Sequence, residues 1–328
     1  SRDFDLSGVL PTPALPASGE DENPSPARGG GWEGEPGFQS DAAYDTLLPI
    51  QWPVRGPAGT SRLFADGRFF TPGGKARMLA APPRGPARPA DGVHPFVFNT
   101  GRIRDQWHTM TRTGKAAKLL AHIDEPFLAM HPDDLVRTGV RAGGLARAHN
   151  GHGEMLARVM ESPDQGPGQV FAPIHWNGRF SARARAGVLV NAVTDPLSGQ
   201  PEFKHAPMAV EPWPAAWHGF VLTRAPLEQV AGDYWTRIPG GACWRQELAG
   251  LERDNAWPER LRGLFGPDGD WIEMKDPAHN RYRAALLRDG RLEMVCFFDR
   301  DAAALPPRHW LQALFEQGEV SRDERIAL

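Results

Sequence analysis

The sequence predicts a mainly β chain built around a closed β-barrel and followed by a small α+β extension. Glycine and proline supply 36 and 32 of the 328 residues, a content that favours turn-rich β structure over a helical bundle. Between about 93 and 210, short apolar runs alternate with tight turns, which is the pattern of a barrel. Beyond about 215, three further apolar runs precede an amphipathic segment, so we expect a separate α+β unit there.

Composition narrows the class of protein. The chain has 37 basic and 40 acidic residues and a formal net charge of -3. This charge balance does not indicate a protein that binds nucleic acid or a membrane surface. No apolar run approaches the roughly 18 residues of a membrane span. Two cysteines, Cys243 and Cys296, exclude a disulfide framework or a four-thiolate metal site made by this sequence. We expect a cytoplasmic chain.

The first 90 residues read as a linker with short hairpins. Prolines and the glycine run 29–31 punctuate the segment up to about residue 40, where little apolar periodicity remains. Farther on, the pairs 63–64 and 69–70 are apolar and flank Asp66-Gly67. This dipeptide favours a hairpin turn, so we expect two short strands around it.

The barrel elements follow in order. Residues 94–98 form a buried strand that ends at 99–101, and 127–130 form another. A helix begins at Pro132, whose ring suits a first turn, and ends at Gly139. Asn150-Gly151 marks a hairpin. Strands are then expected at 155–159 and 169–173.

In the extension, the runs 271–274, 282–287 and 292–298 predict three antiparallel strands. Asp289-Gly290 forms the last hairpin. A helix is expected around 310–315 from its apolar spacing, and a second one around Val221, Leu222 and Leu227.

The segment 99–118 is the strongest candidate for a binding site. It carries five basic residues against one acidic residue, with threonine, glutamine, tryptophan and histidine donors between them. Positive charge and neutral donors at the end of a buried strand suit phosphate and nucleobase recognition. A solvated basic loop is the alternative interpretation.

Within this segment, Thr100-Gly101-Arg102, His108-Thr109 and Met110-Thr111-Arg112 form a pattern that resembles the C-terminal cofactor domain of prokaryotic molybdenum oxidoreductases. These enzymes use molybdenum bis(molybdopterin guanine dinucleotide). The nearest resemblance is to the catalytic subunit of assimilatory nitrate reductases. Supporting segments occur in the same order, at 121–127, 131–134, 168–176 and 194–204.

The resemblance implies a double-psi β-barrel that covers one side of the cofactor. Arg102 is then expected to fork onto a pyrophosphate, Lys204 to supply a point charge, and Thr100 and Thr109 to donate to phosphate or sugar oxygens. No catalytic residue or metal ligand is implied. The implied cofactor-binding residues are Thr100, Gly101, Arg102, Gln106, Trp107, His108, Thr109, Thr111, His175 and Lys204.

The same resemblance implies an incomplete enzyme. Residues 1–90 would lead from a missing upstream domain, 91–212 would be the dinucleotide-binding barrel, and 213–328 the extension. The parent enzyme would reduce nitrate to nitrite in nitrate assimilation, with an iron–sulfur cluster in its missing parts. Its partners would be the upstream domains and an electron-donor protein or domain, without nucleic acid or membrane. The chain alone is expected to be an inactive fragment.

Two alternatives stay open. The same domain occurs in formate dehydrogenases and other molybdopterin oxidoreductases, and a stand-alone nucleotide-binding or interaction module is the second alternative. One position departs from the family pattern, because Gly187 stands where relatives carry an Asn. Asn191 is a candidate to replace that contact.

Four further features have structural explanations. His149 and His152 have metal-ligand spacing, but Asn150-Gly151 between them predicts a hairpin tip. An adjacent pair of carboxylates, at 133 and 134, suits the N-terminus of a helix better than acid–base catalysis. Cys243 has no evident base partner nearby and is expected to be a core or surface thiol, while Cys296 lies in an apolar strand and is expected to be buried and unreactive.

Overall fold

The computed structural model describes residues 49, 62–80, 82–228, 232–252 and 256–328. Their contacts divide the chain into two units, Ser1–Pro83 and Arg84–Leu328. In the first unit, the amide of Gly67 donates to the carbonyl of Phe64, and the rings of Phe64 and Phe69 stack 4.7 Å apart. The turn exists, but residues 62–80 contain no strand. The predicted hairpin is therefore wrong, and the predicted linker before residue 49 lies outside the described residues.

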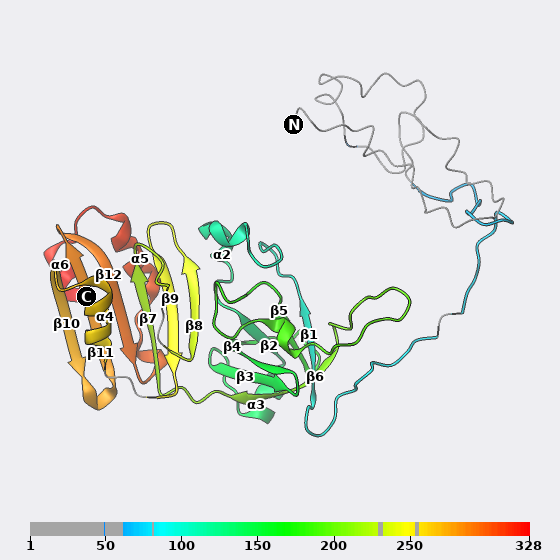
Figure 1. The fold of residues 1–328 in the computed structure, drawn as a ribbon, viewed down its shortest axis with the longest axis horizontal. Helices are drawn as coiled ribbons and strands as arrows, with labels where there is room; N and C mark the ends of the chain where they lie inside the picture. Colours follow the sequence, from blue (N-terminus) through cyan, green and yellow to red (C-terminus); the bar gives the residue numbers. More distant parts are fainter. Residues whose placement is uncertain (1–48, 50–61, 81, 229–231, 253–255) are drawn as a thin grey trace, which may run out of the picture. The chain divides into compact units, whose positions relative to one another are not determined.

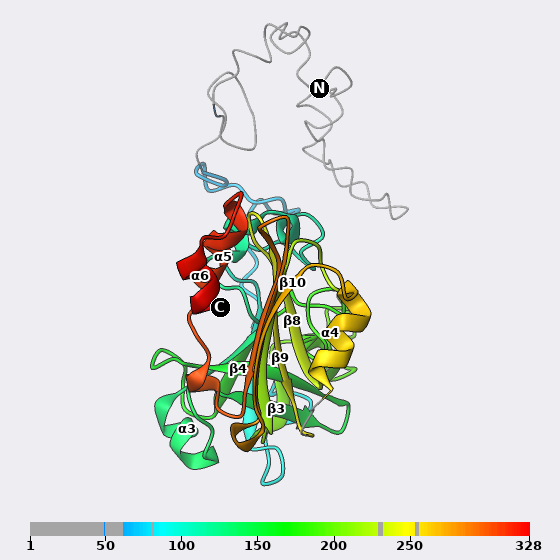
Figure 2. The same ribbon diagram turned by 90° about the vertical axis from the view of Figure 1, so that its left-hand side faces the viewer.

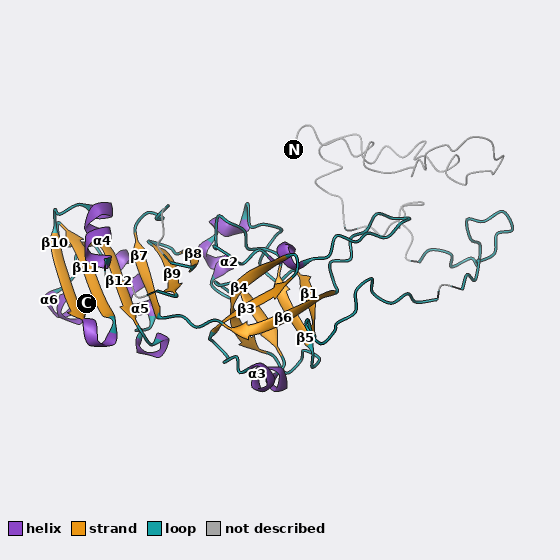
Figure 3. Cartoon of the chain, turned by 60° about the horizontal axis from the view of Figure 1, so that its bottom comes forward, coloured by secondary structure: helices purple, strands orange, loops and turns teal. Residues whose placement is uncertain are grey.

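Six strands of the second unit close into a barrel (Figures 1 and 3). Their order around the barrel is β1-β5-β2-β4-β3-β6, with β1–β5 and β2–β4 parallel and the other pairs antiparallel. This confirms the predicted barrel. The strands are β1 (Phe96–Gly101), β2 (Phe127–Met130), β3 (Leu145–Asn150), β4 (Gly153–Glu161), β5 (Gln169–Pro173) and β6 (Ala206–Pro212).

Alternating side chains fill the barrel. In β1, Phe96, Phe98 and Thr100 are buried, while the residues between them are less so, as expected for a strand with one face on a core. Phe96 and Phe98 pack in one apolar cluster with Leu128 and Met208 from other strands. The predicted strand at 94–98 is thus shifted, because pairing with β5 continues as far as Gly101.

The helix α3 (Pro132–Thr138) follows β2 as predicted. His131 caps its N-terminus by accepting a hydrogen bond from the amide of Asp133, and Gly139 ends it at φ 71°. The Asp134 carboxylate is buried, accepts from the amide of Gly168 at 2.7 Å and pairs with Arg137. These carboxylates therefore serve the helix and its neighbouring loop.

The predicted hairpin at Asn150-Gly151 joins β3 to β4. The Asn150 side chain donates to the carbonyls of Leu189 and Pro207 and accepts from the amide of His152. This asparagine thus ties the turn to neighbouring segments. Among the described residues, no group of three or more His, Cys, Asp or Glu side chains is placed to hold a metal ion.

The rest of the second unit is a six-stranded antiparallel sheet in the order β10-β11-β12-β7-β9-β8. The predicted helix around Val221 and Leu222 is wrong, because both lie in the inner strand β7. Leu227 follows in a loop. The strands are β7 (Trp217–Thr223), β8 (Tyr234–Pro239), β9 (Trp244–Gly250), β10 (Asp270–Asp276), β11 (Arg281–Arg288) and β12 (Arg291–Asp299).

Helices cover both faces of this sheet (Figure 2). The helix α4 (Trp257–Phe265) packs its Trp257 and Leu261 against one face, while α5 (Arg308–Glu316), which confirms the predicted C-terminal helix, covers the other. Short elements complete the unit: η4 (Thr113–Lys115), α2 (Ala117–Leu120), η5 (Ala186–Leu189), η6 (Pro277–His279), η7 (Ala302–Ala304) and α6 (Arg322–Ala327). None of the described helices is long and apolar enough to cross a membrane.

Barrel and sheet share a small core. Trp213, between β6 and β7, is buried with Leu145 and Leu156 of the barrel and Tyr234 of the sheet. The β8 strand also bonds the segment after β5, through the amide of Ala182 and the carbonyl of Trp235. The predicted boundary at 212/213 stays a prediction, because the two parts pack within one compact unit.

Candidate functional site

The candidate site begins where β1 ends. Because β1 and β5 are parallel and pair Gly101 with Pro173, the two segments that follow them leave the same edge of the barrel. One is the 101–110 loop, which holds most of the residues that the sequence analysis selected. The other is the segment 174–177, which contains His175. The fold therefore brings together residues about seventy positions apart.

His175 is fully buried and bonds the 101–110 loop twice. Its Nε2 accepts from the amide of Ile103 at 3.0 Å, and its Nδ1 lies 2.6 Å from the carbonyl oxygen of His108, to which it donates. Burial lowers the pKa of His175, with the charges of Arg102 and His108 acting in the same direction, while the bond to the His108 carbonyl opposes the shift. The ring is thus a neutral support of the loop, and its contact with a ligand stays a prediction.

Asn177 is a neighbouring support that the sequence analysis missed. Its Nδ2 donates to the carbonyl of Thr109 at 2.8 Å, and its Oδ1 accepts from the amide of Arg179. The Asn177-Gly178 dipeptide was a usable signal, because asparagine before glycine commonly marks a turn stabilised by its own side chain.

The backbone of the loop is unusual. Asp105, His108 and Met110 have φ values of 70°, 43° and 59°, in the left-handed region that non-glycine residues rarely adopt. Such conformations persist only where the surroundings enforce them. Here Met110 is fully buried and packs with Trp176 and Phe180.

Several cations of the site have no carboxylate partner among the described residues. Arg104 differs, because it lies against Asp105, whose pKa is lowered by a hydrogen bond to His122 and by Arg104 itself. Arg102 is exposed, and its guanidinium lies 5.5 Å from the centre of the half-exposed Trp107 ring. The exposed cations that form no ion pair with the described residues are Arg102, Arg112, Lys115, Lys118 and Lys204. Unpaired positive charge at one edge suits an anionic ligand.

Lys204 reaches the end of β1, where its Nζ donates to the carbonyl of Thr100. A Cβ added at Gly101 would lie 3.3 Å from that Nζ and 3.2 Å from the Phe171 ring, so the bare backbone is closely approached here. Thr100 itself is buried, and its hydroxyl donates to the carbonyl of Ala172 at 2.7 Å. The hydroxyl hydrogen of Thr100 is therefore used inside the barrel, and the role of Thr100 as a phosphate donor stays a prediction.

Gln106 has a buried acceptor without a partner. Its Nε2 donates to the carbonyl of Leu119, whereas its Oε1 has no hydrogen bond in the described structure. An unpaired buried oxygen costs free energy, and an N–H group of a ligand would satisfy it. Thr109 and Thr111 are exposed, so their hydroxyls are available. A buried free acceptor, exposed cations and hydroxyls fit a nucleotide with phosphates.

The neighbourhood of Gly187 bears on the departure from the family pattern. Open space surrounds its position, since nothing lies within 4 Å of an added Cβ. Asn191 is buried and donates to the carbonyl of His205 at 3.5 Å. Its amide thus has a partner in the chain, and its role in replacing a side chain at 187 stays a prediction.

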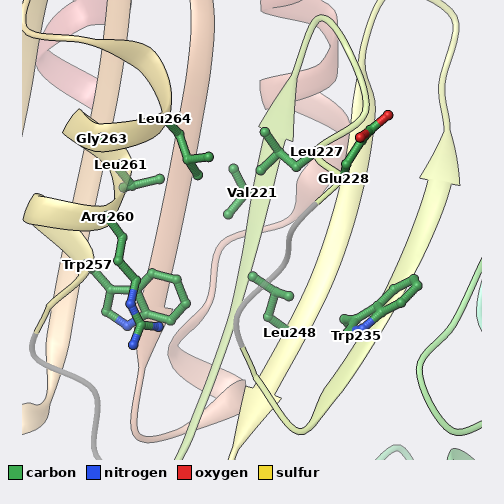
Figure 4. A pocket seen from close by; sticks show the side chains of 10 residues that line it. All are labelled: Val221, Leu227, Glu228, Trp235, Leu248, Trp257, Arg260, Leu261, Gly263 and Leu264. Carbon is green, nitrogen blue, oxygen red and sulfur yellow. The ribbon is translucent and has the colours of Figure 1, made fainter.

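A hollow lies between α4 and the sheet strands β7, β8 and β9 (Figure 4). It has a volume of about 640 Å³ and a mainly apolar lining that includes Trp235, Leu248 and Trp257. Its lining contains none of the residues selected from the sequence. The chemistry-bearing side chains are at the barrel edge, and we place the candidate site there.

Comparison with known families bears on whether the basic loop at the barrel edge is a binding site or a solvated loop. Residues 96–207 match the family model described as "Molydopterin dinucleotide binding domain". The barrel is thus similar to this family. The match begins at the first residue of β1 and includes the whole 101–110 loop and Lys204, so all selected residues lie in the matched segment.

The similarity to individual proteins covers more residues than the match to the family model does. The chain is 38% identical over 218 residues to a nitrate reductase of Klebsiella oxytoca, covering 66% of this chain and 25% of that protein. It is 30% identical over 229 residues to a nitrate reductase of Shewanella frigidimarina, covering 63% and 23%. An F420-dependent formate dehydrogenase subunit alpha of Methanocaldococcus jannaschii is 32% identical over 164 residues, covering 49% and 24%. The chain thus spans about a quarter of these relatives.

Proposed function

We propose that this chain is the C-terminal part of a nitrate reductase and binds the guanine dinucleotide portion of molybdenum bis(molybdopterin guanine dinucleotide). The observation that carries the proposal is the exposed Arg102, which has no carboxylate partner among the described residues and lies on a loop at the edge of a barrel similar to molydopterin dinucleotide binding domains. A guanidinium fork in that position suits a pyrophosphate, which accepts two parallel hydrogen bonds. The family match supports the same class of ligand.

Each exposed group has a role in this proposal. Arg102 binds the pyrophosphate as a fork, and Lys204 adds a point charge beside Gly101, whose missing side chain leaves room for the Lys204 Nζ. Thr109 and Thr111 donate hydroxyl hydrogens to phosphate or sugar oxygens. Trp107 and His108 offer aromatic surfaces, with ring centres 4.5 Å apart. These residues bind and orient, while His175 holds the loop.

The bound group would supply the redox chemistry, a two-electron reduction of nitrate to nitrite with transfer of an oxygen atom. This chain's residues contribute no proton transfer in the proposal. They fix the position of the dinucleotide and exclude water from one side of it. Domains elsewhere in the enzyme would supply the metal ligand, the iron–sulfur cluster and the docking of an electron donor. We place the enzyme in cytoplasmic nitrate assimilation.

Two of the named relatives above are nitrate reductases, and the one of Klebsiella oxytoca matches over more residues than the formate dehydrogenase subunit does. This favours nitrate as the substrate of the complete enzyme. An assay of the complete enzyme with a reduced viologen dye distinguishes a nitrate reductase from a formate dehydrogenase. For a nitrate reductase, nitrate-dependent oxidation of the dye is expected. Formate-dependent dye reduction without nitrate turnover would instead favour the formate dehydrogenase.

A calorimetric titration with guanosine diphosphate tests the binding site itself. Replacing Arg102 by Gln removes a charge-assisted contact and is expected to weaken binding by about 2 kcal/mol. The matched control is Arg141→Gln, at an exposed arginine between α3 and β3 whose side chain forms no ion pair with the described residues. Equal affinity for the wild type and the Arg102 variant would remove Arg102 from the site. Absence of any binding would favour a protein-interaction module.

A further inference from the structure

The 101–110 loop is held from one side by two neighbouring side chains. His175 bonds the amide of Ile103 and the carbonyl of His108, and Asn177 bonds the carbonyl of Thr109. These three hydrogen bonds reach both ends of the loop from a segment that follows β5. They are long-range contacts, since 67 to 72 positions separate the partners.

The backbone of the same loop is strained and keeps its conformation only through contacts with its surroundings. Its left-handed residues Asp105, His108 and Met110 each cost free energy. His108 lies directly at one of the three bonds, and Met110 follows Thr109, which accepts another. The bonds from His175 and Asn177 therefore act where the strain lies.

The two bonds of His175 require opposite roles of its ring nitrogens. Nδ1 faces a carbonyl and must carry hydrogen, whereas Nε2 faces the amide of Ile103 and must not. A protonated ring would carry hydrogen on both nitrogens, so an N–H group would face an N–H group at Ile103. Protonation thus removes one bond and leaves the other.

The charged groups around His175 oppose protonation. Arg102 and His108 face it from the loop and act on it as positive charges, in addition to the effect of burial. The ion pair of Asp105 with His122 and Arg104 is the other titratable group of the loop. His175 is therefore neutral near pH 7, and only acid removes its bond to Ile103.

We propose that His175 is the positioning residue of the 101–110 loop, with Asn177 as its partner. The neutral imidazole holds the loop so that Arg102 is already in the position in which it binds its ligand. Protonation of His175 releases the start of the loop and weakens binding. The hydrogen-bonding role rests on the contacts alone, while the effect on a dinucleotide rests on the proposed function above.

Hydrogen exchange measures the loop without any ligand. We expect the protection factor of peptide 102–110 to fall about tenfold between about pH 7.5 and about pH 4.5 in the wild type, as one backbone hydrogen bond is lost. In His175→Gln, an amide oxygen replaces Nε2 as the acceptor and does not titrate, so less than a twofold fall is expected. The control His152→Gln changes an exposed histidine of the β3–β4 turn and should keep the wild-type profile.

Titration with guanosine diphosphate over the same pH range gives the second readout. Affinity should fall with acid more steeply in the wild type than in His175→Gln, because protonation of the nucleotide's own phosphate weakens binding to both proteins alike. If no variant binds the nucleotide but the exchange profiles differ as expected, the proposed function fails and the positioning role stands. Identical exchange profiles for the wild type and His175→Gln would overturn the positioning role.

Asn177→Ala is a second test of the positioning role, in case melting curves show that His175→Gln does not fold. This variant removes the bond to the Thr109 carbonyl from a half-buried residue. Protection of peptide 102–110 should fall about fivefold at every pH, with the acid dependence of His175 unchanged. Wild-type protection in Asn177→Ala would overturn its part in the proposal.

Discussion

Tyr234 of the sheet donates its hydroxyl hydrogen to the Glu125 carboxylate of the barrel unit at 2.8 Å. Arg158 of β4 binds the same carboxylate through two of its nitrogens, at 3.0 and 3.1 Å. Asp124, the preceding residue, pairs with Arg245 of β9. The segment that returns from the candidate site to β2 is thus attached to the sheet by charged groups.

Replacing Tyr234 by Phe should destabilise this junction. The change removes one hydrogen bond to a half-buried carboxylate, and hydrogen bonds to charged groups contribute about 2 kcal/mol. Urea unfolding should show a free energy of unfolding lower by that amount, with an unchanged dependence on urea concentration. In the background of Glu125→Gln the same replacement should cost less, because its charged partner is gone. Equal costs in both backgrounds would mean that the pair is not coupled.

Glu125 should also make stability depend on acid. Burial alone would raise the pKa of this carboxyl, but the charge of Arg158 and the hydrogen bonds from Arg158 and Tyr234 outweigh burial and lower it below its ordinary 4.5. A lowered pKa in the folded state stabilises the fold above the ordinary value. This stabilisation is lost as the pH falls through the folded-state value.

Urea unfolding at a series of pH values below about 5 checks this prediction. Glu125→Gln should lose part of the acid dependence and show a shallower fall of stability. Glu161→Gln, at an exposed residue of β4, should keep the wild-type slope. A slope in Glu125→Gln as steep as that of the wild type would contradict the lowered pKa.

Gly219 in β7 cannot accept a side chain. A Cβ there would lie 2.1 Å from the Phe298 ring and 2.7 Å from the Phe297 carbonyl oxygen. Gly219→Ala should therefore cost about 3 kcal/mol or prevent folding, as overpacking does in cores. Gly178→Ala is the control, since nothing lies within 4 Å of its Cβ. The urea midpoint measures both variants, and an unshifted midpoint for Gly219→Ala would refute the expected clash.

The cysteines should not react in the folded protein. Cys243 is 3% exposed, and burial raises its pKa to about 11, while Cys296 is fully buried with a raised pKa as well. A thiol that stays protonated is a poor nucleophile. Labelling with an aromatic disulfide reagent should be negligible in buffer and complete in denaturant. Rapid labelling of folded protein would contradict these burial states.

Local signals in the sequence predicted several elements of the barrel and of the sheet. Asn150-Gly151 and Asp289-Gly290 fixed two hairpins, and Pro132 with Gly139 fixed a helix, because each dipeptide or residue restricts its own backbone. The error at Val221 has a physical cause. An inner strand that is buried on both faces is apolar throughout, and its periodicity does not distinguish it from a buried helix.

The candidate site was only partly predictable. Basic charge in 99–118 is visible in the sequence, and the family pattern selected Arg102 and Lys204 within it. The support by His175 and Asn177 requires knowing that β1 and β5 lie side by side. The use of the Thr100 hydroxyl inside the barrel likewise depends on β5. Such long-range contacts have no local signal.

The parallel pairing of β1 with β5 also determines how early β1 can pair while the chain is being synthesised. The partners of β1 are β5 and β6, and Val97 pairs with Gln169. At about 5 to 20 residues per second on a ribosome, β1 waits several seconds for β5 to emerge. During that time the apolar strand, with Phe96 and Phe98, has no sheet to join. Slower growth at low temperature and chaperone capacity should therefore govern the yield of this protein more strongly than its final stability does.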